Sequence, residues 1–150
     1  MTEGRREVSI IGVWLIAANA IGVGALLIHL PSIVAHPAGW RAWLGPLVIG
    51  GIGITAGYRL LRSRSGWALA LVNLLPQTVA VSAGPLAYRL VVGPFLAIRL
   101  DAAPQLSGGI DAHLLLIVGS VNQIPTGIAV NLIPCLALIV FELEWMHRPR

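Results

Sequence analysis

Four apolar runs dominate the pattern of hydrophobic and polar positions along this chain. They cover residues 8–30, 42–61, 66–84 and 124–145, and none of them contains a charged side chain before its terminal turns. A helix that crosses a bilayer needs about 20 mainly apolar residues, and lipid offers no hydrogen-bond partner to unpaired backbone groups. The pattern therefore predicts an all-α four-helix transmembrane bundle that forms a single domain over residues 1–150.

The first run has a second interpretation, because it begins like a secretory signal peptide. Arg5 and Arg6 precede it, and Ala18-Asn19-Ala20 resembles a cleavage site with small residues. The apolar run continues for ten residues beyond that point, to Leu30. A retained anchor fits this length better than a cleaved signal does.

The segment between the third and fourth runs, residues 85–123, is predicted to form a small β-strand segment on the exported side of the membrane. Residues 88–92 and 95–100 favour strands and are separated by Gly93-Pro94, a turn signal, and residues 113–118 form a third such run. A re-entrant or kinked helix is the alternative, because residues 86–100 are apolar enough to extend the third run. That extension would place Arg89 in lipid.

The arginines predict the orientation of the bundle. The chain contains ten Lys and Arg residues, and all of them are arginine. Four crossings place seven arginines on the side of the N-terminus and three on the other side, with the tightest group, Arg59, Arg62 and Arg64, in the shortest loop. Because positive charge is enriched in cytoplasmic loops, both termini are predicted to be cytoplasmic.

Composition agrees with a bilayer as the solvent. The chain is 57% hydrophobic and only 11% charged, and its mean hydropathy is +0.84, whereas a soluble domain has about 25% charged residues. The net charge of +4 is spread over the ends of apolar runs and forms no single stripe, which excludes nucleic acid as a partner. We expect a multi-pass protein of the bacterial inner membrane.

Carboxamides are the strongest polar groups inside the predicted membrane region. Counted from the cytoplasmic ends, Asn19, Gln77 and Asn131 lie at a similar depth of roughly 17–20 Å, and Asn73 is one turn from Gln77 on the same helical face. One hypothesis is that these amides bond across helices and fix their register. A polar lining for a small solute or ion, helped by Thr55, Thr78 and Thr126, is the second. Binding of a lipid headgroup or a cofactor is the third.

Small residues at a spacing of four predict close helix packing. Ala20 and Gly24 form such a pair in the first run, and Gly53 and Gly57 form another in the second run. Small side chains let helix backbones approach each other within a membrane. The sequence leaves open whether these faces meet within one chain or between chains.

Opposite charges gather at the predicted inner interface. Glu142 and Glu144 end the fourth run at the level of Arg59, Arg62 and Arg64. One interpretation is an ion network in contact with solvent and lipid headgroups. The other is a docking site for a cytoplasmic partner.

No catalytic motif accompanies these features. The sequence contains no HExxH, no paired acidic motif and no Cys-x-x-Cys, and its one cysteine, Cys135, lies in an apolar run. We therefore predict no enzyme activity, no metal and no cofactor. The leading hypothesis is a non-catalytic structural or accessory partner of a membrane assembly, in contact with the bilayer and with a second copy or another membrane protein. The alternative is a small-solute channel or transporter lined by the intramembrane Asn and Gln residues.

Overall fold

The fold combines helices with a four-stranded antiparallel sheet. A computed structural model describes residues 3–28, 31, 40–63, 65–83, 86–100, 104–118 and 127–146. The elements of these ranges are α1 (Glu3–Ile28), α3 (Trp40–Ser63), α4 (Trp67–Thr78), β1 (Val79–Ala83), β2 (Leu86–Leu100), β3 (Gln105–Val118), β4 (Gly127–Asn131) and α5 (Leu132–Met146).

The prediction of an all-α four-helix transmembrane bundle is therefore wrong. The third apolar run changes from helix to strand at Val79, and the fourth begins as strand β4 before α5 starts at Leu132. Helices α4 and α5 contain 12 and 15 residues, which gives lengths of about 18 and 22 Å against the roughly 30 Å of a hydrocarbon core. The β-branched residues Val79 and Val81 suit a strand, and β1 and β4 pair with each other.

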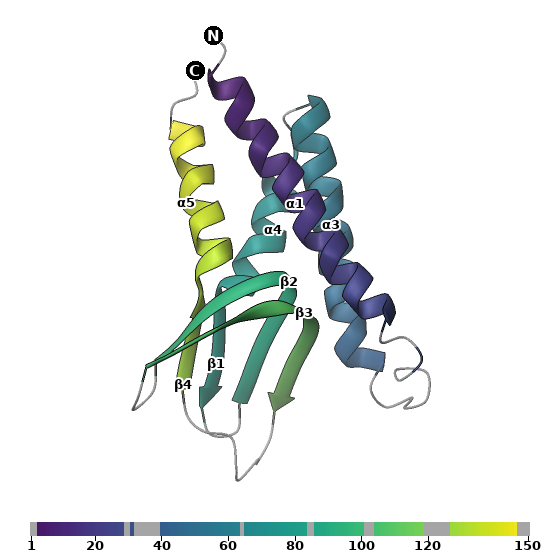
Figure 1. Cartoon of the computed structure of the whole chain (residues 1–150), viewed down its shortest axis with the longest axis vertical. Helices are drawn as coiled ribbons and strands as arrows, with labels where there is room; N and C mark the ends of the chain where they lie inside the picture. Colours follow the sequence, from purple (N-terminus) through teal and green to yellow (C-terminus); the bar gives the residue numbers. More distant parts are fainter. Residues whose placement is uncertain are drawn as a thin grey trace.

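Among the described residues, two helices are long and apolar enough to cross a membrane. The qualifying segments are Ile10–Ile28 in α1 and Trp43–Ser63 in α3. A core helix of a soluble protein can have the same length and composition, and so can a signal sequence in the case of α1. In Figure 1 the start of α1, the α3–α4 junction and the end of α5 lie at the top, and the strands lie at the opposite end.

Strand β2 is the centre of the sheet. One edge pairs with β3 from Leu86↔Val118 to Arg99↔Gln105. On the other edge, residues 86–88 pair with β1 and residues 97–100 pair with β4. Because β1 also pairs with β4, these three strands close into a small ring.

A bend in β2 makes this closure possible. Gly93 has a φ of +96°, which favours glycine. The Gly93-Pro94 pair was predicted to be a turn between two strands, but it lies inside one continuous strand. Figure 1 shows the β2–β3 hairpin curving over β4 and β1.

Helices α1 and α3 pack against the hairpin through glycines. A Cβ atom on Gly22 would lie 2.5 Å from the Gly93 nitrogen, and one on Gly93 would collide with the Ala18 carbonyl oxygen. Gly50 approaches Val92 in the same region. The bend of β2 therefore rests directly on the middle of α1.

The helices share a separate apolar core. Its buried members come from α1, α3 and α4: Ile11, Leu15, Ala56, Leu60, Ala70 and Leu74.

Only one of the two predicted small-residue pairs lies at a helix contact. A Cβ atom on Gly57 would meet the Gly12 carbonyl oxygen and Ile16 of α1, and one on Gly53 would collide with the side chain of Asn19. By contrast, a Cβ atom on Gly24 would meet nothing within 4 Å, and Ala20 is exposed. Helix α1 uses Gly12 and Gly22 for its close contacts, a signal that the sequence analysis did not select.

Candidate functional site

All four predicted carboxamides are buried. Asn19, Asn73, Gln77 and Asn131 have exposed fractions of 2%, 0%, 7% and 7%. The Asn73 Nδ2 donates to the Asn19 Oδ1 at 2.9 Å and to the Ile49 carbonyl at 2.7 Å. These bonds join α1, α3 and α4 through one side chain.

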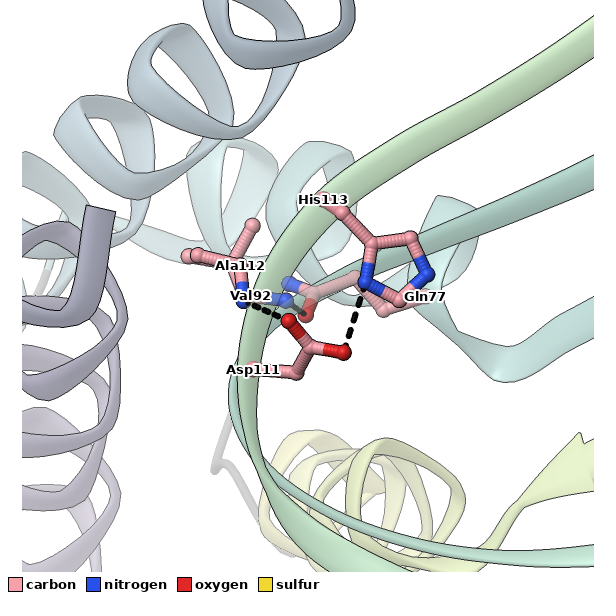
Figure 2. Close-up of polar contacts among 5 residues, drawn as sticks. All are labelled: Gln77, Val92, Asp111, Ala112 and His113. Atoms are coloured by element: carbon pink, nitrogen blue, oxygen red, sulfur yellow. Dashed lines mark hydrogen bonds and ion pairs between the residues drawn. The ribbon is translucent and has the colours of Figure 1, made fainter. Parts of the chain in front are cut away.

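Gln77 connects this helical network to the sheet. Its Nε2 donates to the Asn73 carbonyl at 2.9 Å, and its Oε1 accepts the Val92 N–H at 2.9 Å. Figure 2 shows this contact at the bend of β2. Val92 lies between the stretch of β2 that pairs with β1 and the stretch that pairs with β4. The Gln77 oxygen therefore accepts a bond from a β2 N–H at a position that neither β1 nor β4 pairs with.

Asn131 also accepts a hydrogen bond from a β2 N–H, and it caps a helix. Its Oδ1 accepts the Leu96 N–H at 3.2 Å and the Ile133 N–H at 3.3 Å. The second bond is that of an N-cap residue to the second residue of a helix, here α5. The prediction placed Asn131 inside a transmembrane helix, but it is the last residue of β4. The Asn-x-x-Pro pattern at 131–134 was a helix-start signal that the sequence analysis did not use.

A cavity of about 250 Å³ lies inside the bend of the hairpin. We call it the strand cavity. Gln77 and Asn131 line it together with Arg89, Phe95 and Arg99 of β2, and Ala80, Ala129 and Ser107 complete the other walls. The Arg89 guanidinium carbon lies 5.3 Å from the centroid of the Phe95 ring, within the range of a cation–π interaction.

The arginines are the part of this site that the sequence analysis missed. From the sequence, the arginines were interpreted as markers of orientation, and Arg89 also as a reason against a helix through residues 86–100. Their signal was a spacing by even numbers of residues: Arg89, Phe95 and Arg99 are all odd-numbered positions of one strand, and alternate residues of a strand share a face. Because Gly93-Pro94 was predicted to separate two strands, this shared face was not apparent from the sequence.

A second polar pair lies on β3 (Figure 2). The His113 Nδ1 is 2.7 Å from the Asp111 Oδ2, and the Asp111 Oδ1 accepts the Ala112 N–H at 2.8 Å. Their side chains are 27% and 43% exposed. The register places Asp111 opposite Gly93 and His113 opposite Val91.

The hydroxyls proposed as helpers do not join the amides. The Thr55 hydroxyl donates to the Gly51 carbonyl and the Thr78 hydroxyl to the Leu75 carbonyl, each within its own helix. Thr126 lies outside the described residues.

The predicted charge cluster is only partly described. Arg59 and Arg62 are exposed near the end of α3, and Glu142 is exposed on α5. Among the described side chains, Arg62 contacts Tyr58 and does not pair with Glu142: its Nη1 donates to the tyrosine hydroxyl at 2.6 Å. Arg64 and the side chain of Glu144 lie outside the described part.

Neither a metal site nor a known relative guides the functional assignment. The described residues contain no group of three His, Cys, Asp or Glu side chains that could hold a metal ion. No protein-family model, no curated protein and no solved structure matches the chain.

Proposed function

We propose that this chain is an integral membrane protein with a non-catalytic, structural or accessory role in a membrane assembly. The observation that carries the membrane location is the exposed apolar surface of α1 and α3. Only 39% and 33% of the residues in their two candidate spans are buried. A core helix of a soluble protein would bury most of that surface, because contiguous exposed apolar patches of this size are rare in water.

Individual side chains support the same conclusion. Ile10 and Ile28, near the two ends of the α1 span, are 65% and 77% exposed, and Leu44 and Val48 of α3 are also exposed. The exposed surface of both helices is therefore suited to lipid acyl chains. For the finer location we retain the inner membrane of a bacterium with both ends in the cytoplasm, which is motivated by the distribution of the arginines.

The bonding of the amides favours a structural role over a solute path. Both ends of the Asn19, Asn73 and Gln77 carboxamides are occupied by one another or by backbone groups. A path for a solute needs polar groups that can exchange partners with it. Amides that hold three helices and a strand in register are better suited to a fixed scaffold than to a channel lining.

Two measurements on the whole chain test this proposal. Cell membranes that contain the protein are washed with alkaline carbonate, which releases peripheral proteins. We expect the chain to stay with the lipid, and recovery as a monomer in detergent-free buffer would overturn the membrane location. Native mass spectrometry after mild-detergent extraction tests the accessory role. We expect a complex of defined stoichiometry with a second copy or another membrane protein, and a lone monomer would contradict it.

A further inference from the structure

The strand cavity has the chemistry of an anion site. We propose that it binds a phosphate group, with the Arg89 guanidinium and the Asn131 side-chain amide as donors. This assignment goes beyond the scaffold role above and does not depend on it.

Arg89 supplies the positive charge. Its side chain lines the cavity, and among the described residues its guanidinium contacts the Phe95 ring and forms no ion pair. The ring holds one face of the planar group, which leaves its N–H edge for a ligand. Arginine binds the oxygens of phosphate through two parallel N–H donors.

Asn131 supplies an NH₂ donor, and the hydrogen bonds to its amide oxygen show on which side this NH₂ group lies. Only an amide oxygen can accept from a backbone N–H, so the bonds from Leu96 and Ile133 identify that oxygen and place the NH₂ group on the other side. Neither bond uses this NH₂ group, and no other hydrogen bond of the described residues does. The side chain is 7% exposed and lines the cavity. An amide NH₂ group that is accessible from the cavity can donate to a ligand oxygen there.

The charge of the residues that line the cavity indicates which class of ligand it binds. Arg89 contributes its charge to the cavity wall, and none of the described residues that line the cavity carries a carboxylate. Asp111 lies further along the hairpin, opposite Gly93, where the Ala112 N–H and His113 contact both of its oxygens. The Arg89 guanidinium therefore presents a positive charge to a ligand in the cavity.

The positions of the donors favour phosphate over carboxylate. Arg89 and Asn131 lie on different strands of the closed ring, β2 and β4. A carboxylate has two oxygens, and one arginine fork can occupy both of them. A tetrahedral phosphate has more oxygens pointing in different directions, so it can reach donors on separate strands. The volume of about 250 Å³ admits such a group with a small substituent.

The phosphate could belong to a free solute or to a lipid headgroup. Both sources share the chemistry that the cavity recognises, and the experiment separates them. The detergent-purified whole chain is titrated with inorganic phosphate by calorimetry, and native mass spectrometry records whether it retains dioleoyl phosphatidic acid over dioleoyl glycerol. Binding of both probes indicates a site open to free phosphate, whereas binding of the lipid alone indicates a headgroup site.

Three variants test the assignment. Arg89→Gln removes the charge, and Asn131→Asp keeps an oxygen for Leu96 and Ile133 but replaces the NH₂ donor with a negative oxygen. We expect each to weaken binding about tenfold or more, the loss typical of one charge-assisted hydrogen bond. Arg62→Gln is the matched control, because Arg62 also stacks on an aromatic ring, that of Tyr58, and lies outside the cavity. It should bind like the wild type.

Three outcomes would overturn the assignment. They are wild-type protein that binds neither probe, binding that survives Arg89→Gln unchanged, and an equal loss in Arg62→Gln. Thermal melting of each variant identifies one that fails to fold, and Arg89→Gln then decides the matter if Asn131→Asp does not fold.

Discussion

The buried amide network offers the sharpest test of how the helices are held together. Asn73 is fully buried and donates two short hydrogen bonds, one to Asn19 of α1 and one to the Ile49 carbonyl of α3. Replacing Asn73 with leucine keeps a similar volume but removes both donors. It also leaves the Asn19 oxygen buried without its partner. We expect the free energy of unfolding to fall.

The magnitude follows from the bonds lost. Hydrogen bonds between membrane helices are worth about 0.6 kcal/mol each on average, so two of them give a lower value of roughly 1 kcal/mol. In a protein interior each bond contributes about 1 kcal/mol and an orphaned polar group costs about 1–3 kcal/mol more, so two lost bonds and one orphaned oxygen give an upper value near 5 kcal/mol. Because Asn73 is enclosed by protein and not by lipid, we expect a loss of about 2–3 kcal/mol for Asn73→Leu.

A double-mutant cycle isolates the bond between Asn19 and Asn73. Asn19→Ala is the partner variant, because the Asn19 side chain lies against Gly53 and the smaller alanine side chain introduces no new contact there. Once Asn19 is absent, Asn73→Leu no longer leaves its oxygen unpaired, so the double variant should be about 1 kcal/mol more stable than the sum of the single losses.

Reversible unfolding in mixed detergent micelles, followed by circular dichroism, measures all four proteins. Leu75→Ala is the control, since Leu75 neighbours the network but is 54% exposed, and it should change stability by less than about 0.5 kcal/mol. If the two losses add within about 0.3–0.5 kcal/mol, the side chains are not coupled and the argument fails.

Three further expectations follow from the sheet and its contact with α1. Gly93→Ala should destabilise the protein by about 2 kcal/mol or more in the same unfolding assay, because its φ is +96° and the new methyl group would meet the Ala18 carbonyl. Gly24→Ala should be neutral or stabilising by up to about 1 kcal/mol, since its Cβ would meet nothing within 4 Å, and a large loss there would contradict the packing described. Burial raises the pKa of the Tyr88 hydroxyl, which donates to the Pro76 carbonyl at 2.7 Å. The folded state thus holds this proton more tightly than the unfolded chain, and stability should fall as pH rises above about 10. A pH titration of Tyr88→Phe should lack this component, and an identical profile would refute it.

The sequence was most informative for residues whose chemistry allows few environments in a folded protein. A buried amide must find partners, so Asn19, Asn73 and Gln77 stood out in any apolar environment, and the structure brings these three into one network. The spacing of the arginines on β2 was equally visible in the sequence, but it indicates a shared face only if β2 is one unbroken strand. The positive φ of Gly93 preserves that strand, and a Gly-Pro pair by itself favours a turn.

Hydrophobicity alone could not predict where helix gives way to strand within the third and fourth apolar runs. Residues 79–83 and 127–131 continue apolar runs that already contain helix, and short apolar segments do not distinguish a strand from a buried helix. What decides these segments is pairing between β1, β4 and β2, which are separated in sequence. Their closed ring satisfies backbone groups that a lone strand would leave open.

In this chain a helix continues directly into a strand, so the distance that one residue spans differs between the two halves of the same segment. A helix rises about 1.5 Å per residue and a strand about 3.3 Å. At those rises, α4 followed by β1 extends about 34 Å with 17 residues, whereas α3 needs 24 residues for about 36 Å. One residue inserted in the strand half would displace the end of such a composite element about twice as far as one inserted in the helical half. Natural length variation is therefore expected to be tolerated less well in β1 and β4 than in α4 and α5.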